Sequence, residues 1–345
     1  MKNLNNREIA SFCSQVAMFQ QAGITPVEGM RLLLSDAKTS EAKKIYEKII
    51  STCMSGEPFY TGLESAEVFP EYVLHMVKLG EESGNLDDVM NSLASYYERE
   101  DEIADSIRSA ISYPSIMIAM MFLVIIVLIT KVLPIFNQVF IQLGSEMSGF
   151  SASLLKLGNQ INTYSVVFLL LLILCVGLYF YATKTASGKR IVRKVLYKIP
   201  FTKKLYDNIA AGRFASGIAL TTASGMDTYR SLDLVAQLVE NDTIKEKIGI
   251  CKKSLLNGSS FPEAIGECGI FSNFYTRMIA VGSKTGSTDT VMNKIADTYQ
   301  KETTKKLADL ISVLEPTLVI ILSLIVGLIL LSVILPLMGV MSSIG

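Results

Sequence analysis

The sequence predicts an all-α membrane protein that has two homologous cytoplasmic helical bundles, of about six helices each, and three transmembrane helices. Half of the 345 residues are apolar, and the mean hydropathy of +0.39 is high for a water-soluble chain. Three stretches are apolar over the roughly 20 residues that a helix needs to cross a membrane. The chain also repeats itself at one offset, so that each long polar segment leads into an apolar stretch.

The three apolar stretches run from about Ser115 to Phe136, from about Ser165 to Ala182 and from about Thr317 to Met338. In the loop between the first and second stretches, the only charged residues are Glu146 and Lys156. The second stretch is followed by a run of Lys and Arg residues that contains no Asp or Glu. By the positive-inside rule, residues 183 onward are cytoplasmic and the loop is external. The first 14 residues contain no hydrophobic stretch to serve as a signal peptide, so we expect a cytoplasmic N-terminus. The basic run could also bind nucleic acid, but its place beside a membrane span favours an interfacial helix.

These boundaries give seven expected segments in chain order. They are a first cytoplasmic helical bundle (1–112), a transmembrane helix (113–136), a short external loop (137–164), a second transmembrane helix (165–182), a basic interfacial helix with the second cytoplasmic bundle (183–315), a third transmembrane helix (316–338) and an external tail (339–345).

The internal repeat has an offset of 202 residues. It aligns LGEESGNLDDVMNSLASYYERE (79–100) with VGSKTGSTDTVMNKIADTYQKE (281–302), and Pro114, just before the first span, with Pro316, just before the third. The same offset holds from residue 12 to residue 134. The chain is therefore a duplicated unit of helical domain plus span.

The stretch VGSKTGST (281–288) looks at first like a phosphate-binding loop, but its lysine precedes the second glycine instead of following it. In the first copy, Glu81 and Glu82 stand at the positions of Ser283 and Lys284, and their carboxylates would repel a phosphate. A helix-helix turn, with Gly84 or Gly286 ending one helix, explains both copies without a ligand. We expect structural turns at six glycines: Gly23, Gly80, Gly84, Gly225, Gly282 and Gly286.

Helix starts are marked along the first copy. Thr25 is followed by Pro26 and, three residues after the cap, by Glu28, which is the pattern of a capping box. Further starts are expected near Thr39, Glu57-Pro58, Pro70 and Asn85.

Composition argues against several classes of function. His75 is the only histidine, and the five cysteines show no metal-ligand spacing, so we expect no metal site, no cofactor and no catalytic residue. We interpret the cysteines as buried and reduced. Within the spans, Lys131 near one end is the only charged residue, which argues against a transporter or proton relay.

The chain resembles the inner-membrane platform proteins of type IV pilus and type II secretion machines, the family often called PilC or GspF. SFCSQVAMFQQAGITPVEGMRLL resembles the family's opening helix, Ala-Gly turn and second helix. KIPFTKKLYDNIAAGRFASGIALTTASGMDTYRSL resembles the start of its second domain, with the Arg-Phe pair at Arg213 and Phe214. LGEESGNL resembles its Gly-Glu-x-x-Gly turn, and Pro114 and Pro316 resemble its pre-span prolines. The resemblance covers nearly the whole chain.

The resemblance implies a non-enzymatic scaffold in the bacterial inner membrane. It implies that the bundles face a hexameric assembly ATPase in the cytoplasm, and that the spans contact pilin or pseudopilin subunits and membrane lipids. Other inner-membrane assembly proteins and a second copy of the chain, most simply in a dimer, are further expected partners, and nucleic acid is not. A small membrane transporter or sensor subunit is the alternative, and an enzyme ranks third.

The candidate surface for docking the motor is acidic. It comprises Glu81, Glu82, Glu98, Glu100, Asp101 and Glu102. A solvated helix face would explain the same charges. The second copy has Ser283 and Lys284 at the turn, so neither an acidic docking site nor a cation site is expected there.

Overall fold

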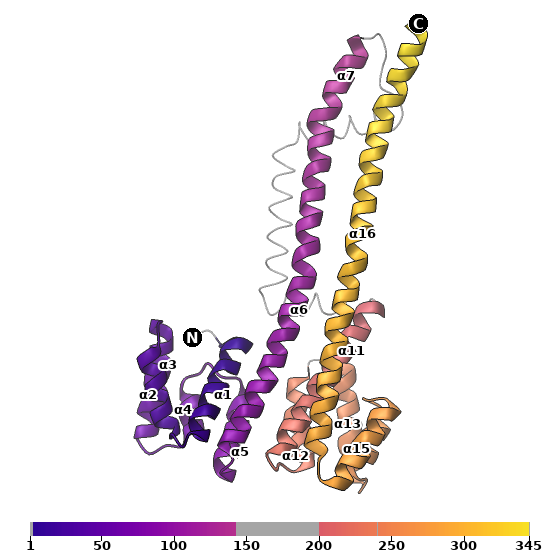
Figure 1. Ribbon diagram of the computed structural model, residues 1–345. Helices are drawn as coiled ribbons and strands as arrows, with labels where there is room; N and C mark the ends of the chain where they lie inside the picture. Colours follow the sequence, from indigo (N-terminus) through magenta and orange to yellow (C-terminus); the bar gives the residue numbers. More distant parts are fainter. Residues whose placement is uncertain (1–2, 143–199, 240, 345) are drawn as a thin grey trace. The chain divides into compact units, whose positions relative to one another are not determined.

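The computed structural model describes residues 3–142, 200–239 and 241–344. Within these ranges every regular element is a helix (Figure 1), which confirms the all-α class for the described residues. The chain divides into two compact units. They are Met1–Ser106 with Lys203–Lys305, and Ile107–Thr202 with Lys306–Gly345. Helices of both sequence copies thus share the first unit.

The helices of the two copies follow the same order. In the first copy they are α1 (Asn6–Gln21), α2 (Pro26–Asp36), α3 (Ser40–Met54), α4 (Phe59–Ser65), α5 (Glu71–Ser83), α6 (Leu86–Val127), a π-helical segment (Leu128–Val132) and α7 (Leu133–Gln142). In the second copy they are α11 (Pro200–Ala223), α12 (Thr228–Leu238), α13 (Asp242–Leu256), α14 (Phe261–Cys268), α15 (Asn273–Thr285) and α16 (Thr288–Ile344).

Helix starts lie where the sequence predicts them. Thr25 accepts a hydrogen bond from the backbone N–H of Glu28, and the Glu28 carboxylate accepts one from the backbone N–H of Thr25. This capping box satisfies N–H groups that the first helical turn leaves without partners. Thr39, Pro58 and Pro70 immediately precede α3, α4 and α5. The predicted starts of these four helices are therefore confirmed.

The two glycines of each repeated turn have different roles. Positive φ angles occur at four of the six predicted turn glycines, Gly23, Gly84, Gly225 and Gly286. Gly84 and Gly286 end α5 and α15 in the left-handed conformation, which costs other residues roughly 1–2 kcal/mol. Gly80 and Gly282 lie inside these helices, so their prediction as turns was wrong. A Cβ at Gly80 would lie 3.0 Å from the Cβ of Val89, and one at Gly282 would lie 2.7 Å from the equivalent valine. Glycine is needed there because the next helix passes close by.

Each copy has its own hydrophobic core, and the cores contain equivalent aromatic pairs. The rings of Phe12 and Phe69 lie 4.9 Å apart in the first core, and those of Phe214 and Phe271 lie 5.7 Å apart in the second. Each pair differs from the other by the offset of 202 residues. Leu220 of the second copy is buried in the first core, so the two copies pack together inside the first unit.

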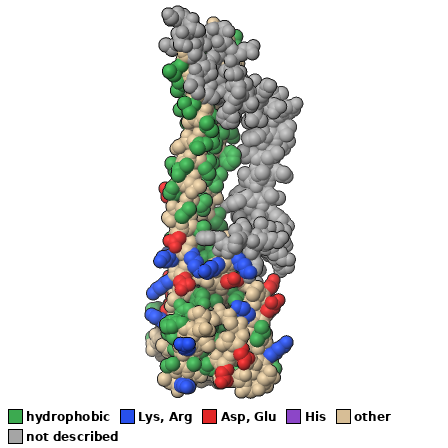
Figure 2. Space-filling model, turned by 90° about the vertical axis from the view of Figure 1, so that its right-hand side faces the viewer, with side chains coloured by type: hydrophobic (Ala, Val, Ile, Leu, Met, Phe, Trp, Pro, Cys, Tyr) green, Lys and Arg blue, Asp and Glu red, His purple; other side chains and the backbone are tan. Residues whose placement is uncertain are grey.

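Two of the described helices are long and apolar enough to cross a membrane. The candidate spans lie within Leu86–Val139 and Thr288–Leu331, and 0% and 6% of their most apolar windows are buried. Figure 2 shows hydrophobic side chains along these helical stretches, whereas Lys, Arg, Asp and Glu gather on the bundles. Exposed apolar side chains of this extent are typical of helices that face lipid. The predicted second span (165–182) lies outside the described residues.

Candidate functional site

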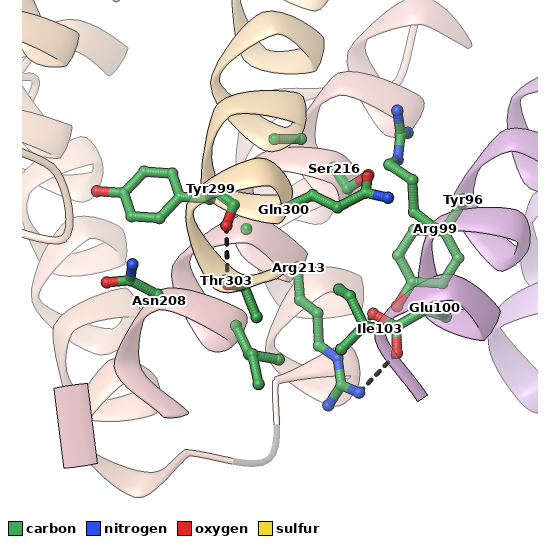
Figure 3. Close-up of a pocket in the computed structure, with 13 residues that line it drawn as sticks. Tyr96, Arg99, Glu100, Ile103, Asn208, Arg213, Ser216, Tyr299, Gln300 and Thr303 are labelled. Atoms are coloured by element: carbon green, nitrogen blue, oxygen red, sulfur yellow. Dashed lines mark hydrogen bonds and ion pairs between the residues drawn. The ribbon is translucent and has the colours of Figure 1, made fainter. Parts of the chain in front are cut away.

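The two copies are joined by an ion pair between α11 and α6. Arg213 on α11 points its guanidinium at Glu100 on α6 (Figure 3). The Nε–Oε1 distance is 2.8 Å and the Nη2–Oε2 distance is 2.5 Å, so the contact is bidentate. Glu100 is 8% exposed. A carboxylate that is removed from water in this way needs a charged partner, and the fork of an arginine provides one with defined geometry.

A second group of polar contacts joins α6 to α16. Arg99 donates to Asp297 at 3.1 Å and to Asn293 at 3.4 Å. Gln300 donates to Glu102 in the same region. Because these contacts connect residues about 200 positions apart in sequence, they fix how one copy packs on the other within the first unit.

The space between these contacts is small. A cavity of about 20 Å³ lies among Arg99, Glu100, Arg213 and Ser216, and it is large enough for about one water molecule. Burial and, to a smaller extent, the charge of Glu100 raise the pKa of Tyr96 well above its usual value of 10.0, so this phenol stays neutral at physiological pH. The junction is therefore a structural contact and not a pocket for a substrate.

The six residues of the predicted acidic surface differ in how exposed they are and in whether they already have a partner. Glu100 is buried in the ion pair with Arg213, so its prediction as a docking residue was wrong. Asp101 accepts from Arg7 at 2.8 Å. Glu81 accepts from the backbone N–H groups of Phe59 and Tyr60, at 2.7 Å and 3.0 Å, and thereby caps α4. Of the six predicted residues, Glu82, Glu98 and Glu102 are exposed.

Replacing Glu81 by alanine should lower the free energy of unfolding by about 1 kcal/mol, because two N–H groups at the start of α4 lose their acceptor. Replacing the exposed Glu82 by alanine should change it by less than about 0.5 kcal/mol. Urea unfolding of the detergent-solubilised chain, followed by circular dichroism, measures both values. Equal effects of the two substitutions would show that Glu81 is not a cap.

The role of Arg213 was not predicted from the sequence, in which this arginine stands out only as part of the Arg-Phe pair. A signal was present, because Arg213 lies on a helix whose neighbouring positions, such as Ile209 and Phe214, belong to the buried face. A charge in such a place usually has a buried partner. The repeat adds to this signal, because the equivalent position in the first copy is Ser11.

The cysteines that the structure describes form no disulfide. Burial raises the pKa of Cys13 to about 12, so its thiol is protonated and unreactive at neutral pH. Among the described residues, no group of three or more His, Cys, Asp or Glu side chains is placed to hold a metal ion. Cys175 lies outside the described residues.

A comparison with family models finds one match that occurs twice. The model described as type II secretion system (T2SS), protein F, matches residues 12–134 and residues 214–336. The two matches are offset by 202 residues, as is the repeat found in the sequence. They include residues 86–134 of the first described candidate span and the whole of the second. The duplicated organisation is therefore confirmed.

Curated relatives align over nearly the whole chain. A type IV pilus assembly protein PilC of Thermus thermophilus is 27% identical over 340 residues, which cover 98% of this chain and 84% of the relative. A protein of the same name from Myxococcus xanthus is 28% identical over 342 residues, with 99% and 82% covered. A type II secretion system protein F of Aeromonas hydrophila is 24% identical over 338 residues, with 98% and 87% covered.

Proposed function

The chain belongs to the family of type II secretion system protein F, and from this premise we propose that it is the inner-membrane platform of a filament-assembling machine. The filament is a type IV pilus or a type II secretion pseudopilus. The platform performs no catalysis of its own. It couples a hexameric assembly ATPase in the cytoplasm to the extraction of pilin or pseudopilin subunits from the membrane.

The observation that carries this proposal is the continuity of two long helices. α6 and α16 begin among buried core residues, such as Met90 and Met292, and continue without interruption into the candidate spans. From Leu86 to Pro114, α6 extends about 42 Å at 1.5 Å per residue. A displacement imposed on a bundle would reach the membrane through a continuous helix and not through a non-helical linker.

The proposed topology follows from the charges in the sequence. The N-terminus and both bundles lie in the cytoplasm, three helices cross the membrane, and the short C-terminal tail lies outside. Pilin or pseudopilin subunits contact the spans, whose exposed apolar surfaces suit partners that are themselves embedded in lipid. Other inner-membrane assembly proteins and further copies of the chain complete the assembly.

The motor docks at the turn between α5 and α6 in this proposal. The turn lies at the N-terminal end of α6, whereas the candidate span lies in the C-terminal part of the same helix, so a cytoplasmic motor can approach the turn. Glu82 is exposed at this turn, and its only ion pair that the structure describes is a loose one of 4.0 Å with Lys78. The equivalent turn of the second copy carries Lys284 and serves as the control.

Crosslinking in intact cells tests this docking. A photoreactive residue at position 82 should capture the assembly ATPase, and the same residue at position 284 should not. Capture at both positions, or at position 284 alone, would contradict docking at the acidic turn. Failure at both positions, in cells that need the chain for filaments, would reject this surface but leave the platform role intact.

A further inference from the structure

A groove on the first copy has an equivalent in the second copy that is already filled. This open groove lies between α1 and α6 and has a volume of about 490 Å³. Six of the residues that line the groove have equivalents in the second copy, 202 positions further along the chain. All six equivalents line the small cavity at the junction between the copies. The six groove residues are Arg7, Ala10, Ser11, Ser14, Glu98 and Asp101. The same part of the fold is thus open in one copy and nearly closed in the other.

The groove of the second copy is filled by one face of α6. Tyr96, Arg99, Glu100 and Ile103 form this face, and all four line the cavity of about 20 Å³ that remains (Figure 3). The filled groove of the second copy therefore shows which kind of surface fits such a groove. It is one face of a long helix that continues into a candidate span.

The equivalent face of the second copy is largely exposed, and within the described ranges its polar contact with another helix is a hydrogen bond of 3.2 Å that Asn208 donates to Glu302. Adding 202 to the four positions gives Thr298, Lys301, Glu302 and Lys305 on α16. Lys301, Glu302 and Lys305 are exposed, and Thr298 is partly exposed. The contact between the copies therefore runs in one direction only, from the face of copy one to the groove of copy two. Among the described residues, such a contact leaves one groove and one matching face without a long helix packed against them, and it can repeat between chains.

The groove and the exposed face of α16 have complementary charges. The open groove carries the carboxylates of Glu98, Asp101 and Glu102, together with the guanidinium of Arg7. The exposed face of α16 brings Lys301 and Lys305. Ile103 and Thr303 both line the cavity of the existing junction, and in the same register Lys305 and Asp101 take their places. Asp101 already accepts from Arg7, so Lys305 brings a second positive charge near this carboxylate.

We propose that the open groove binds the α16 face of a second copy of this chain. Both α6 and α16 continue into candidate spans in the same chain direction, so a second chain in the same membrane presents α16 with the direction that α6 has in the existing junction. The copies then alternate around an axis normal to the membrane, and two or more chains close into a ring. This inference concerns assembly and does not depend on where the motor docks.

Photocrosslinking of the full-length chain in native membranes tests the proposal. Two forms with different tags are coexpressed, and one carries a photoreactive residue in place of Ser11, which is exposed in the open groove. The expected product contains both tags, and its crosslinked peptide maps to 298–305 of the partner chain. The same photoreactive residue in place of Ser51, exposed on α3, should give no such product.

A charge exchange tests the register. Asp101→Lys should lower the yield of the two-tag product about fivefold, as should Lys305→Glu, because an attraction becomes a repulsion. The chain with both substitutions should regain most of the yield, and Glu47→Lys, at an exposed position of α3, should leave the yield unchanged. The proposal is overturned if no two-tag product forms, if position 11 captures the basic segment 184–204 of its own chain, or if it captures only a different protein.

Discussion

Replacing Arg213 by alanine is expected to lower the free energy of unfolding by about 3 kcal/mol, the largest effect of any single substitution considered. The substitution leaves the carboxylate of Glu100 in a site that is 8% exposed, without the two hydrogen bonds that Arg213 provides. The loss comes mainly from this buried, uncompensated charge. Urea unfolding followed by circular dichroism is the suitable measurement, because the chain contains no tryptophan for fluorescence.

Two further variants test whether the buried charge of Glu100 causes this loss of stability. Arg99→Ala removes an ion pair whose Asp297 side chain is 47% exposed, and it should cost at most about 1 kcal/mol. Replacing Glu100 by leucine and Arg213 by methionine together should recover most of the loss, because no buried charge is left unpaired. If Arg213→Ala costs no more than Arg99→Ala, the pair does not hold the two copies together.

Replacing Gly80 by alanine is expected to lower the free energy of unfolding by about 2 kcal/mol. The new Cβ would lie 3.0 Å from both Cβ and Cγ2 of Val89, and 3.2 Å from the Cα of Leu86. Because the contact with Leu86 is a backbone contact, a change of side-chain rotamer cannot relieve it. The start of α6 would have to move away from α5, at a point where both helices belong to the core.

Gly249 provides the matched control. It lies inside α13, and a Cβ placed there would have no atom within 4 Å. Gly249→Ala should therefore raise the free energy of unfolding by about 0.5–1 kcal/mol, because alanine has the higher helix propensity. If both substitutions changed stability in the same direction, the close approach of α5 and α6 at Gly80 would not be a tight contact in solution.

The duplication and the local signals could be predicted from the sequence. The repeat needed only the identity of residues at one offset, and the helix start at Thr25 needed only residues within four positions. The difference between Gly80 and Gly84 could not be predicted in this way. Both are glycines of one short motif, but Gly84 ends a helix, whereas Gly80 meets Val89 across a helix-helix contact.

The sequence also does not show which carboxylates of the acidic stretch 98–102 are buried. Glu98 and Glu100 are two positions apart, and consecutive positions on a helix point about 100° apart, so the two side chains have different surroundings. Only Glu100 meets Arg213, which lies 113 residues further along the chain. Sequence identifies the charges, but packing between the copies decides which carboxylate is buried and which remains available to a partner.

We propose that this chain is the platform on which a filament assembles. The most direct measurement is a count of surface filaments, or of secreted substrate, in the native host after the gene is deleted and after the full-length chain is restored. We predict that filaments disappear on deletion while pilin or pseudopilin subunits remain in the inner membrane, and that the restored chain brings the filaments back. Normal filaments in the deletion strain would contradict the claim.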